Sequence, residues 1–134
     1  MKWRWPLYPL ALFLFIWEPL RIAGEVTQSL STIGMRGGPA VVELIAHAMV
    51  AAIAVAAAWS LWNGAHHGPA MAIVALILSA AASVQSLYWS RLPHQTPPGA
   101  QLPLATIAVA HAAAWVAYLS HHQHDLPNHT TRLQ

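Results

Sequence analysis

A carboxylate and an imidazole stand one helical turn apart inside a long apolar segment. Glu43 and His47 lie in the run VVELIAHAMVAAIAVAAAWSLW, residues 41–62. Residues four apart on a helix share a face, so the two side chains can interact directly. A carboxylate in this position can orient a ligating histidine, and the pair could also relay a proton. The favoured alternative keeps Glu43 near the headgroups, where the positive end of the helix dipole suits a carboxylate.

A second imidazole, His111, stands in another apolar run, AVAHAAAW. His47 follows Pro39 by eight residues, and His111 follows Pro103 by eight residues. At 1.5 Å per residue, each imidazole is roughly 12 Å from its helix start. If the two helices run in the same direction, the two rings are predicted to lie at one depth. Two level histidines are what the axial ligation of a b-type haem requires.

The haem hypothesis also assigns roles to two arginines. Arg36 and Arg91 are predicted on the same membrane side and could meet the haem propionates. Two histidines without an accompanying motif are an unspecific pattern, however, and a non-haem metal is a further alternative. The structural alternative is that each imidazole hydrogen-bonds a carbonyl, a serine or Glu43. The cofactor is therefore left unknown, with haem b as the candidate.

Further histidines gather in the loops and in the polar tail HHQHDLPNHTTRLQ. His121, His122 and His124 could bind Zn²⁺ or Cu²⁺, because imidazole is a good ligand for both ions. Histidine clusters in a flexible tail are more often simply solvated. The sequence thus offers only a weak metal hypothesis here.

The composition indicates a membrane protein. Charged residues make up 7% of the 134 residues, against about 25% in an average soluble domain. Ten charged side chains cannot cover the surface of a soluble protein of this size, so lipid is the expected solvent. The six Lys and Arg residues are scattered singly, which argues against nucleic-acid binding. Without cysteine, the chain has no disulfide or thiolate metal site.

Four apolar segments are long enough to cross a bilayer as helices. They are predicted at about 3–23, 39–62, 69–89 and 103–120. Residues 24–38 are a polar connector, either an interfacial helix or a continuation of the first span, and 121–134 form the tail. The predicted fold is one all-α membrane domain, residues 1–134, with four transmembrane helices in an up-down bundle.

Small residues and a few polar groups are expected to hold the helices together, because lipid provides little hydrophobic drive between helices. Glu18 and Arg21 are three apart and could neutralise each other. Ser79, Ser83 and Gln85 are expected to donate hydrogen bonds between helices. The predicted packing ladders are Ala48, Ala52, Ala56 and Ser60; Ala75, Ser79 and Ser83; and Ala110 and Ala114.

Three functional classes follow. The favoured one is an accessory or structural subunit of a larger membrane complex, without catalytic activity of its own. The alternatives are a haem- or metal-binding redox protein that uses His47 and His111, and a small transporter or proton-relay element that uses Glu43 and His47. The expected partners are the lipid bilayer and either other membrane subunits or further copies of the chain. We expect a cell inner membrane, with the N-terminus cytoplasmic.

Overall fold

The chain folds into a bundle of long helices. A computed structural model describes residues 7–30, 33–90 and 96–122. Four of its helices are long and apolar enough to span a membrane, which confirms the predicted all-helical, four-span fold. The elements are α1 (Leu7–Ser29), α2 (Ile33–Arg36), α3 (Gly38–Trp62), α4 (Gly68–Tyr88) and α5 (Gln101–His122).

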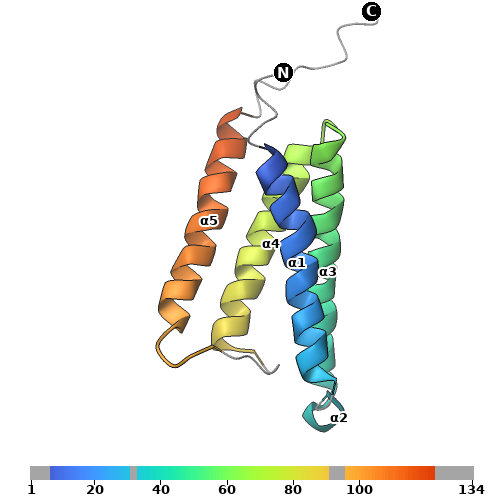
Figure 1. The fold of residues 1–134 in the computed structure, drawn as a ribbon, viewed down its shortest axis with the longest axis vertical. Helices are drawn as coiled ribbons and strands as arrows, with labels where there is room; N and C mark the ends of the chain where they lie inside the picture. The colour runs from blue at the N-terminus through green and yellow to red at the C-terminus, as the bar shows by residue number, and fades with distance from the viewer. Residues whose placement is uncertain (1–6, 31–32, 91–95, 123–134) are drawn as a thin grey trace, which may run out of the picture.

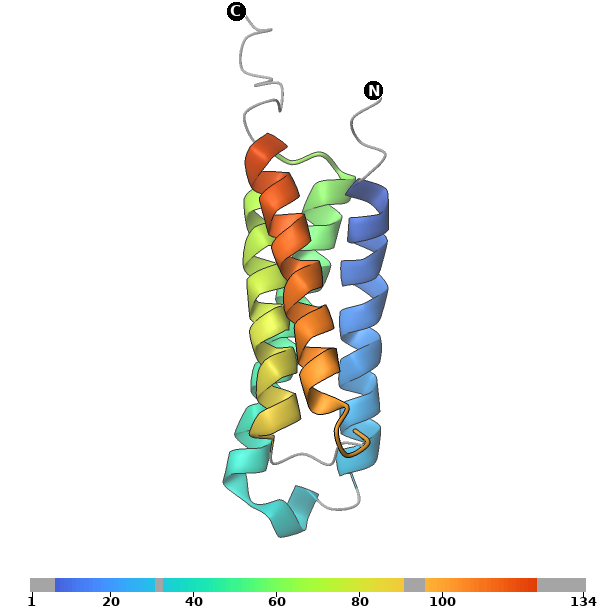
Figure 2. The same cartoon turned by 90° about the vertical axis from the view of Figure 1, so that its left-hand side faces the viewer.

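The long helices alternate in direction along the chain (Figures 1 and 2). Helix α1 packs on α3, α3 packs on α4, and α4 packs on α5. We call the end that holds α2, the start of α3 and the end of α4 the α2 end. The opposite end, which holds the loop 63–67 between α3 and α4, is the turn end. The start of α1 and the end of α5 both lie at the turn end (Figure 1).

The helix boundaries follow local sequence signals, with one extension. Helices α3 and α4 each carry a proline beside their first residue, as predicted, because proline there loses no hydrogen bond. Helix α1 runs on to Ser29, six residues past the predicted end of the first span. Two alternatives were open for the connector 24–38. Its first part, up to Ser29, continues the helix of the first span. This extension places Glu25 on the same rigid helix as Glu18.

The apolar core is built mainly from leucine and small side chains. Alanines on α3 and α4 let the helix backbones approach closely, as in other membrane bundles. The core lies mostly toward the turn end and includes Leu10, Leu14, Ala54, Ala57, Ala58, Leu61, Ala72, Ala75 and Leu76. Ala75 and Ser79 face inward as predicted, and they belong to the inner face of α4.

The rows of small residues predicted to pack between helices on α3 and α5 are exposed instead. Ala48, Ala52 and Ala56 are exposed, and so are Ala110 and Ala114. The buried face of α3 instead carries His47, Ala51, Ala54 and Ala58. Because α3 is apolar around its whole circumference, its sequence does not distinguish one row of alanines from the next.

A close approach of backbones marks the turn between α3 and α4. A Cβ atom at Gly68 would lie 3.1 Å from the carbonyl carbon and oxygen of Ser60. The turn also contains Gly64 with a positive φ of 67°, a conformation that favours glycine. Glycine at both positions therefore lets α3 and α4 form a tight antiparallel pair.

Candidate functional site

Three charged side chains lie on one face of α1 in its half nearer the α2 end. Glu18, Arg21 and Glu25 follow each other at spacings of three and four residues. The Arg21 guanidinium bonds the Glu18 carboxylate at 2.9 Å and the Glu25 carboxylate at 3.2 Å. Glu18 is fully buried, and its other oxygen accepts a hydrogen bond from the Ser79 hydroxyl on α4. The Glu18–Arg21 pair predicted from the sequence is confirmed.

His47 connects α1 to α4. Its Nδ1 lies 2.7 Å from Glu25 Oε2, and its Nε2 lies 2.9 Å from Gln85 Oε1. The residue is only 3% exposed. Both ring nitrogens are therefore used in contacts between helices.

Gln85 extends the chain of contacts to Glu43. Its amide nitrogen donates to Glu43 Oε1 at 3.0 Å, and the Ser90 hydroxyl donates to the same oxygen at 2.6 Å. Gln85 thus joins Glu43 to His47, while Glu25 supplies a carboxylate bonded directly to the imidazole. We call the connected set the polar network; it consists of Ser79, Glu18, Arg21, Glu25, His47, Gln85, Glu43 and Ser90.

The polar network gathers the charges of an otherwise apolar bundle. The sequence contains three glutamates, and all of them belong to the network. Arg21 is the one Lys or Arg within the four long helices as the structure describes them. Ionisable groups inside membrane spans are costly, and they usually face the bundle interior where they pair or act.

Hydrogen-bond roles fix where protons lie around His47. The Gln85 nitrogen faces the Glu43 carboxylate, so the amide oxygen faces His47 Nε2, which must carry a proton to donate. On the other side, Glu25 and His47 Nδ1 need one proton between them. That proton is on the imidazole, as an ion pair, or on the carboxyl group, as a neutral pair. Because Arg21 also bonds Glu25, the ion pair with a doubly protonated His47 is favoured.

The two protonation forms leave the charge of the polar network unchanged. With the ion pair, three carboxylates oppose Arg21 and a charged His47. With the neutral pair, two carboxylates oppose Arg21 alone. Both forms leave one net negative charge. The proton can therefore move between Glu25 and His47 without an additional charge entering the apolar bundle.

His111 lies apart from the polar network. Its ring contacts Phe13 on α1 at a centroid distance of 4.6 Å, whereas His47 bonds Glu25 of the same helix. Twelve residues separate Phe13 from Glu25, which is about 18 Å along a helix. The expected equal depth of the two imidazoles is therefore not found. The reason is that α3 starts at the extreme of the α2 end while α5 starts farther into the bundle (Figure 1).

These positions give the haem hypothesis no support. Both nitrogens of His47 are engaged, and Nε2 of His111 accepts a hydrogen bond from the Trp115 indole at 3.2 Å. Of the arginines assigned to propionates, Arg36 lies in the short helix α2, and Arg91 lies outside the described residues. Haem b stays a prediction from the sequence alone.

The tail histidines are only partly described. His121 and His122 end helix α5, with their rings 5.1 Å apart, and His124 lies outside the described residues. Within residues 7–30, 33–90 and 96–122, no group of three or more His, Cys, Asp or Glu side chains could hold a metal ion. The three-histidine hypothesis therefore stays a prediction.

A cavity of about 380 Å³ lies beside the polar network, bounded by residues of α1, α4 and α5. We call it the α4–α5 cavity. Arg21 and Ser79 line it, so it adjoins the Glu18 end of the network. Its other lining residues are Phe13, Trp17, Leu76, Ser83, Ser86, Leu87, Leu104, Ile107, Ala108, His111 and Ala112.

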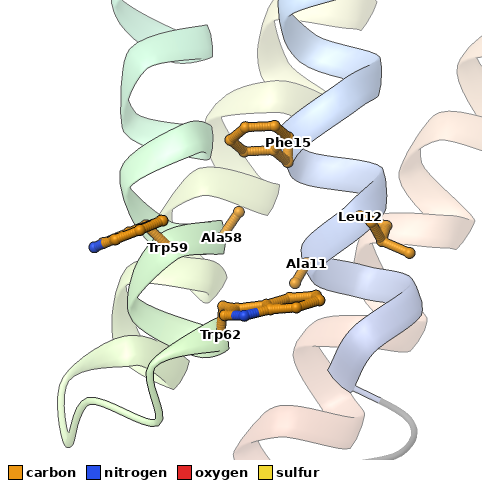
Figure 3. A pocket seen from close by; sticks show the side chains of 6 residues that line it. All are labelled: Ala11, Leu12, Phe15, Ala58, Trp59 and Trp62. Atoms are coloured by element: carbon orange, nitrogen blue, oxygen red, sulfur yellow. The ribbon is translucent and has the colours of Figure 1, made fainter.

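A second hollow, between α1 and α3 near the turn end, has a different character. Its lining is apolar, formed by Ala11, Leu12, Phe15, Ala58, Trp59 and Trp62 (Figure 3). Trp62 extends from α3 toward α1, and its ring meets Tyr8 edge-on at 5.2 Å. Apart from the indole N–H groups of Trp59 and Trp62, no polar side-chain group lines it, so this groove is a surface suited to lipid chains.

Comparisons with known proteins assign the chain to no family. Neither protein-family models, nor curated proteins, nor solved structures give a match to the chain.

Sequence reasoning anticipated part of the polar network and missed its centre. The sequence offers a partnership of Glu43 and His47 as the alternative to a position of Glu43 near the headgroups, and the structure joins the two residues through Gln85. Ser79, Ser83 and Gln85 are expected as donors between helices; Ser79 and Gln85 are, whereas Ser83 donates to the Ser79 carbonyl of its own helix. Glu25 was not predicted, because it falls in the segment interpreted as a connector. A signal was present: Glu25 lies seven residues after Glu18, which puts the two on one face of any helix that continues through 25.

Proposed function

We propose that this chain is a membrane proton-relay element. The observation that carries the proposal is the Glu25–His47 bond, 2.7 Å long, which shares one proton between a carboxylate and an imidazole at no change in net charge. Imidazole accepts and donates protons in many relays, and here it is in direct contact with a carboxylate that can exchange a proton with it. The proposal keeps Glu43 and His47 from the sequence hypothesis and adds Glu25 as the direct partner.

The relay is oriented toward the α2 end. Ser90 and Glu43 form its outer part, because Glu43 lies near the start of α3. Gln85 fixes which nitrogen of His47 carries a proton. A carboxamide does not itself carry protons, so in the proposed step the Gln85 side chain swings aside and the Nε2 proton of His47 passes directly to the carboxylate of Glu43, one turn away on the same helix face. Arg21 holds the Glu18 and Glu25 carboxylates in place and takes no part in the proton transfer. Glu18, beyond Arg21, neutralises the arginine.

Proton flux in liposomes tests the proposal. The full chain is reconstituted, a potassium gradient with valinomycin drives protons, and an enclosed dye reports the internal pH. We expect Glu25→Gln to reduce the flux at least tenfold, because the amide cannot exchange the shared proton. Thr27→Val is the matched control, since this exposed hydroxyl on α1 bonds only its own helix.

Two results would contradict the relay. One is a flux through Glu25→Gln equal to that of the unmodified chain. The other is an unmodified chain that conducts no more than protein-free liposomes. Circular dichroism of both variants shows whether the helices are retained, and Glu43→Gln provides an independent variant at the outer end of the path.

A second candidate function is the accessory subunit expected from the composition. The observation that favours it is the outward orientation of two rows of small residues on α3 and α5. Such rows are typical of surfaces on which another transmembrane helix packs. They are Ala48, Ala52 and Ala56, and Ala110 and Ala114. We propose that a helix of a different subunit packs on these rows. Extraction of the native complex should then yield a second polypeptide together with the 14.5 kDa chain.

The proposed location is a cell inner membrane with the N-terminus in the cytoplasm. The composition and the four apolar helices support a multi-pass membrane protein. In this orientation the α2 end, with Ser90 and Glu43, faces away from the cytoplasm. The relay would then exchange protons with the outer face.

A further inference from the structure

The α4–α5 cavity presents a defined set of hydrogen-bonding groups. On its α4 side are three serine hydroxyls whose protons are already used. Ser79 donates to Glu18, Ser83 donates to the Ser79 carbonyl at 2.8 Å, and Ser86 donates to the Ser83 carbonyl at 3.1 Å. A hydroxyl has one donor and two acceptor sites, so these serines retain acceptor sites. A ligand on this side must therefore bring its own donor.

The α5 side of the cavity supplies a donor. Because Nε2 of His111 accepts a hydrogen bond from the Trp115 indole, the neutral ring carries its proton on Nδ1. Among the described residues, this Nδ1 makes no hydrogen bond. A ligand on this side can therefore accept a bond from His111. A ligand that contacts both sides must therefore both donate and accept, which a single hydroxyl can do.

Charge and shape narrow the ligand further. Arg21 is neutralised by Glu18 and Glu25, and the polar network as a whole is negative, so an anionic headgroup gains nothing here. A neutral ligand is favoured. Phe13 and Trp17 lie nearly parallel along the cavity, 15° between ring planes and 6.2 Å between centroids, which suits an aromatic ring. The other lining residues are mostly apolar and suit a hydrocarbon tail.

We propose that the α4–α5 cavity binds a neutral, membrane-soluble hydroquinone. One ring hydroxyl donates to a serine on α4 and accepts from His111 Nδ1, and the ring packs beside Phe13 and Trp17. When the acceptor is Ser79, one further hydrogen bond connects the ligand to Glu18. The proposal goes beyond the proton relay and does not depend on it, because none of these contacts involves His47.

Binding to the full chain in nanodiscs tests the site. The probes are 2-decylhydroquinone, its oxidised form 2-decyl-1,4-benzoquinone, and decylbenzene, which has a ring and tail but no oxygen. Binding of 2-decyl-1,4-benzoquinone is read from quenching of tryptophan fluorescence, and the other two probes are measured by competition with it, with empty nanodiscs subtracted. We expect the hydroquinone to bind most tightly, because only its hydroxyl satisfies both sides of the cavity. Decylbenzene should bind at least tenfold more weakly.

Two variants on α5 locate the site. Ala108 lines the cavity, and Ala110 on the same helix faces outward. Ala108→Phe should weaken hydroquinone binding at least tenfold by filling the space, while Ala110→Phe should leave it unchanged. His111→Phe keeps a ring but removes the donor, and should weaken binding about three- to tenfold, the value of one hydrogen bond.

Different results would overturn the location of the site and the class of its ligand. Equal binding by the Ala108→Phe and Ala110→Phe variants would overturn the location. Equal affinity for decylbenzene and 2-decylhydroquinone would overturn the ligand class, because the cavity would then select only apolar bulk. Loss of proton flux in Glu25→Gln with these binding results intact would uphold the relay and the hydroquinone site as separate properties.

Discussion

At the scale of single residues, the protonation of His47 is the property most open to measurement. We expect ¹⁵N NMR of the full chain to show both ring nitrogens protonated near neutral pH, because Glu25 and Gln85 each require a donor. In Glu25→Gln the carboxylate that stabilises the second proton is lost, so the ring should become singly protonated. A singly protonated His47 in the unmodified chain would show that the neutral pair is the resting form.

Arg21 is the second residue whose replacement should have a large effect. Arg21→Met leaves Glu18 and Glu25 without their shared cation inside the bundle. Breaking a buried ion pair from one side costs about 3–5 kcal/mol, so we expect the free energy of unfolding to fall by about that amount. Unfolding in mixed micelles measures the change.

A double variant provides the control for Arg21. Arg21→Met combined with Glu18→Gln removes the buried negative charge as well as the cation. We expect it to recover part of the lost stability, because an amide can still accept the bond from Ser79. A double variant less stable than Arg21→Met alone would contradict the assignment of Glu18 as the main buried partner.

The residue scale also shows how far the sequence could predict the site. Glu43 and His47 could be predicted as a local pair because a four-residue spacing fixes their common face. Their connection through Gln85 could not, since it depends on the rotation of α4 about its own axis. The depth of His111 was misjudged for a related reason: counting residues from each proline assumes that all helices begin in one plane.

At the scale of elements, the existence of the helices was predictable and their orientation was not. Long apolar runs with proline at the start give spans that agree with the structure. Helix α3, however, presents alanine on every side, so periodicity gives no preferred face, and the predicted row of alanines is exposed in the structure. Two ionisable residues break the uniformity, Glu43 and His47, and His47 does lie on the buried face.

The turn between α3 and α4 allows a paired test of packing. Gly68→Ala would bring a Cβ atom to 3.1 Å from the Ser60 backbone, which cannot move away without opening the turn. We expect a loss of about 1–3 kcal/mol in the free energy of unfolding, the usual effect of overpacking. Gly24→Ala is the control, because nothing lies within 4 Å of its added Cβ atom.

The control itself has an expected sign. Gly24 lies inside α1, where replacement of glycine by alanine usually stabilises a helix by up to about 1 kcal/mol. Opposite signs at the two glycines would therefore confirm the close helix contact at Gly68. Equal effects would argue that the α3–α4 turn has room to relax.

At the scale of the whole molecule, the up-down arrangement predicts which loops share a membrane side. The chain has no cysteine, so single cysteines can be introduced without background labelling. In sealed vesicles, a membrane-impermeant maleimide should label His67→Cys and Gly99→Cys from opposite sides. Met35→Cys, in α2, should behave like Gly99→Cys (Figure 1). Labelling of His67→Cys and Gly99→Cys from one side would exclude the arrangement.

Helix α5 contributes no residue to the polar network, and this affects how a molecule dissolved in the bilayer could reach the bundle interior. The polar network ties α1, α3 and α4 together, while none of its members comes from α5. The described contacts between α5 and its neighbours are ring and aliphatic contacts, with no ion pair or side-chain hydrogen bond among the described residues to hold them. A hydrophobic molecule could thus pass sideways from the membrane into the protein by displacing α5, while the charged groups beyond the seam stay in register.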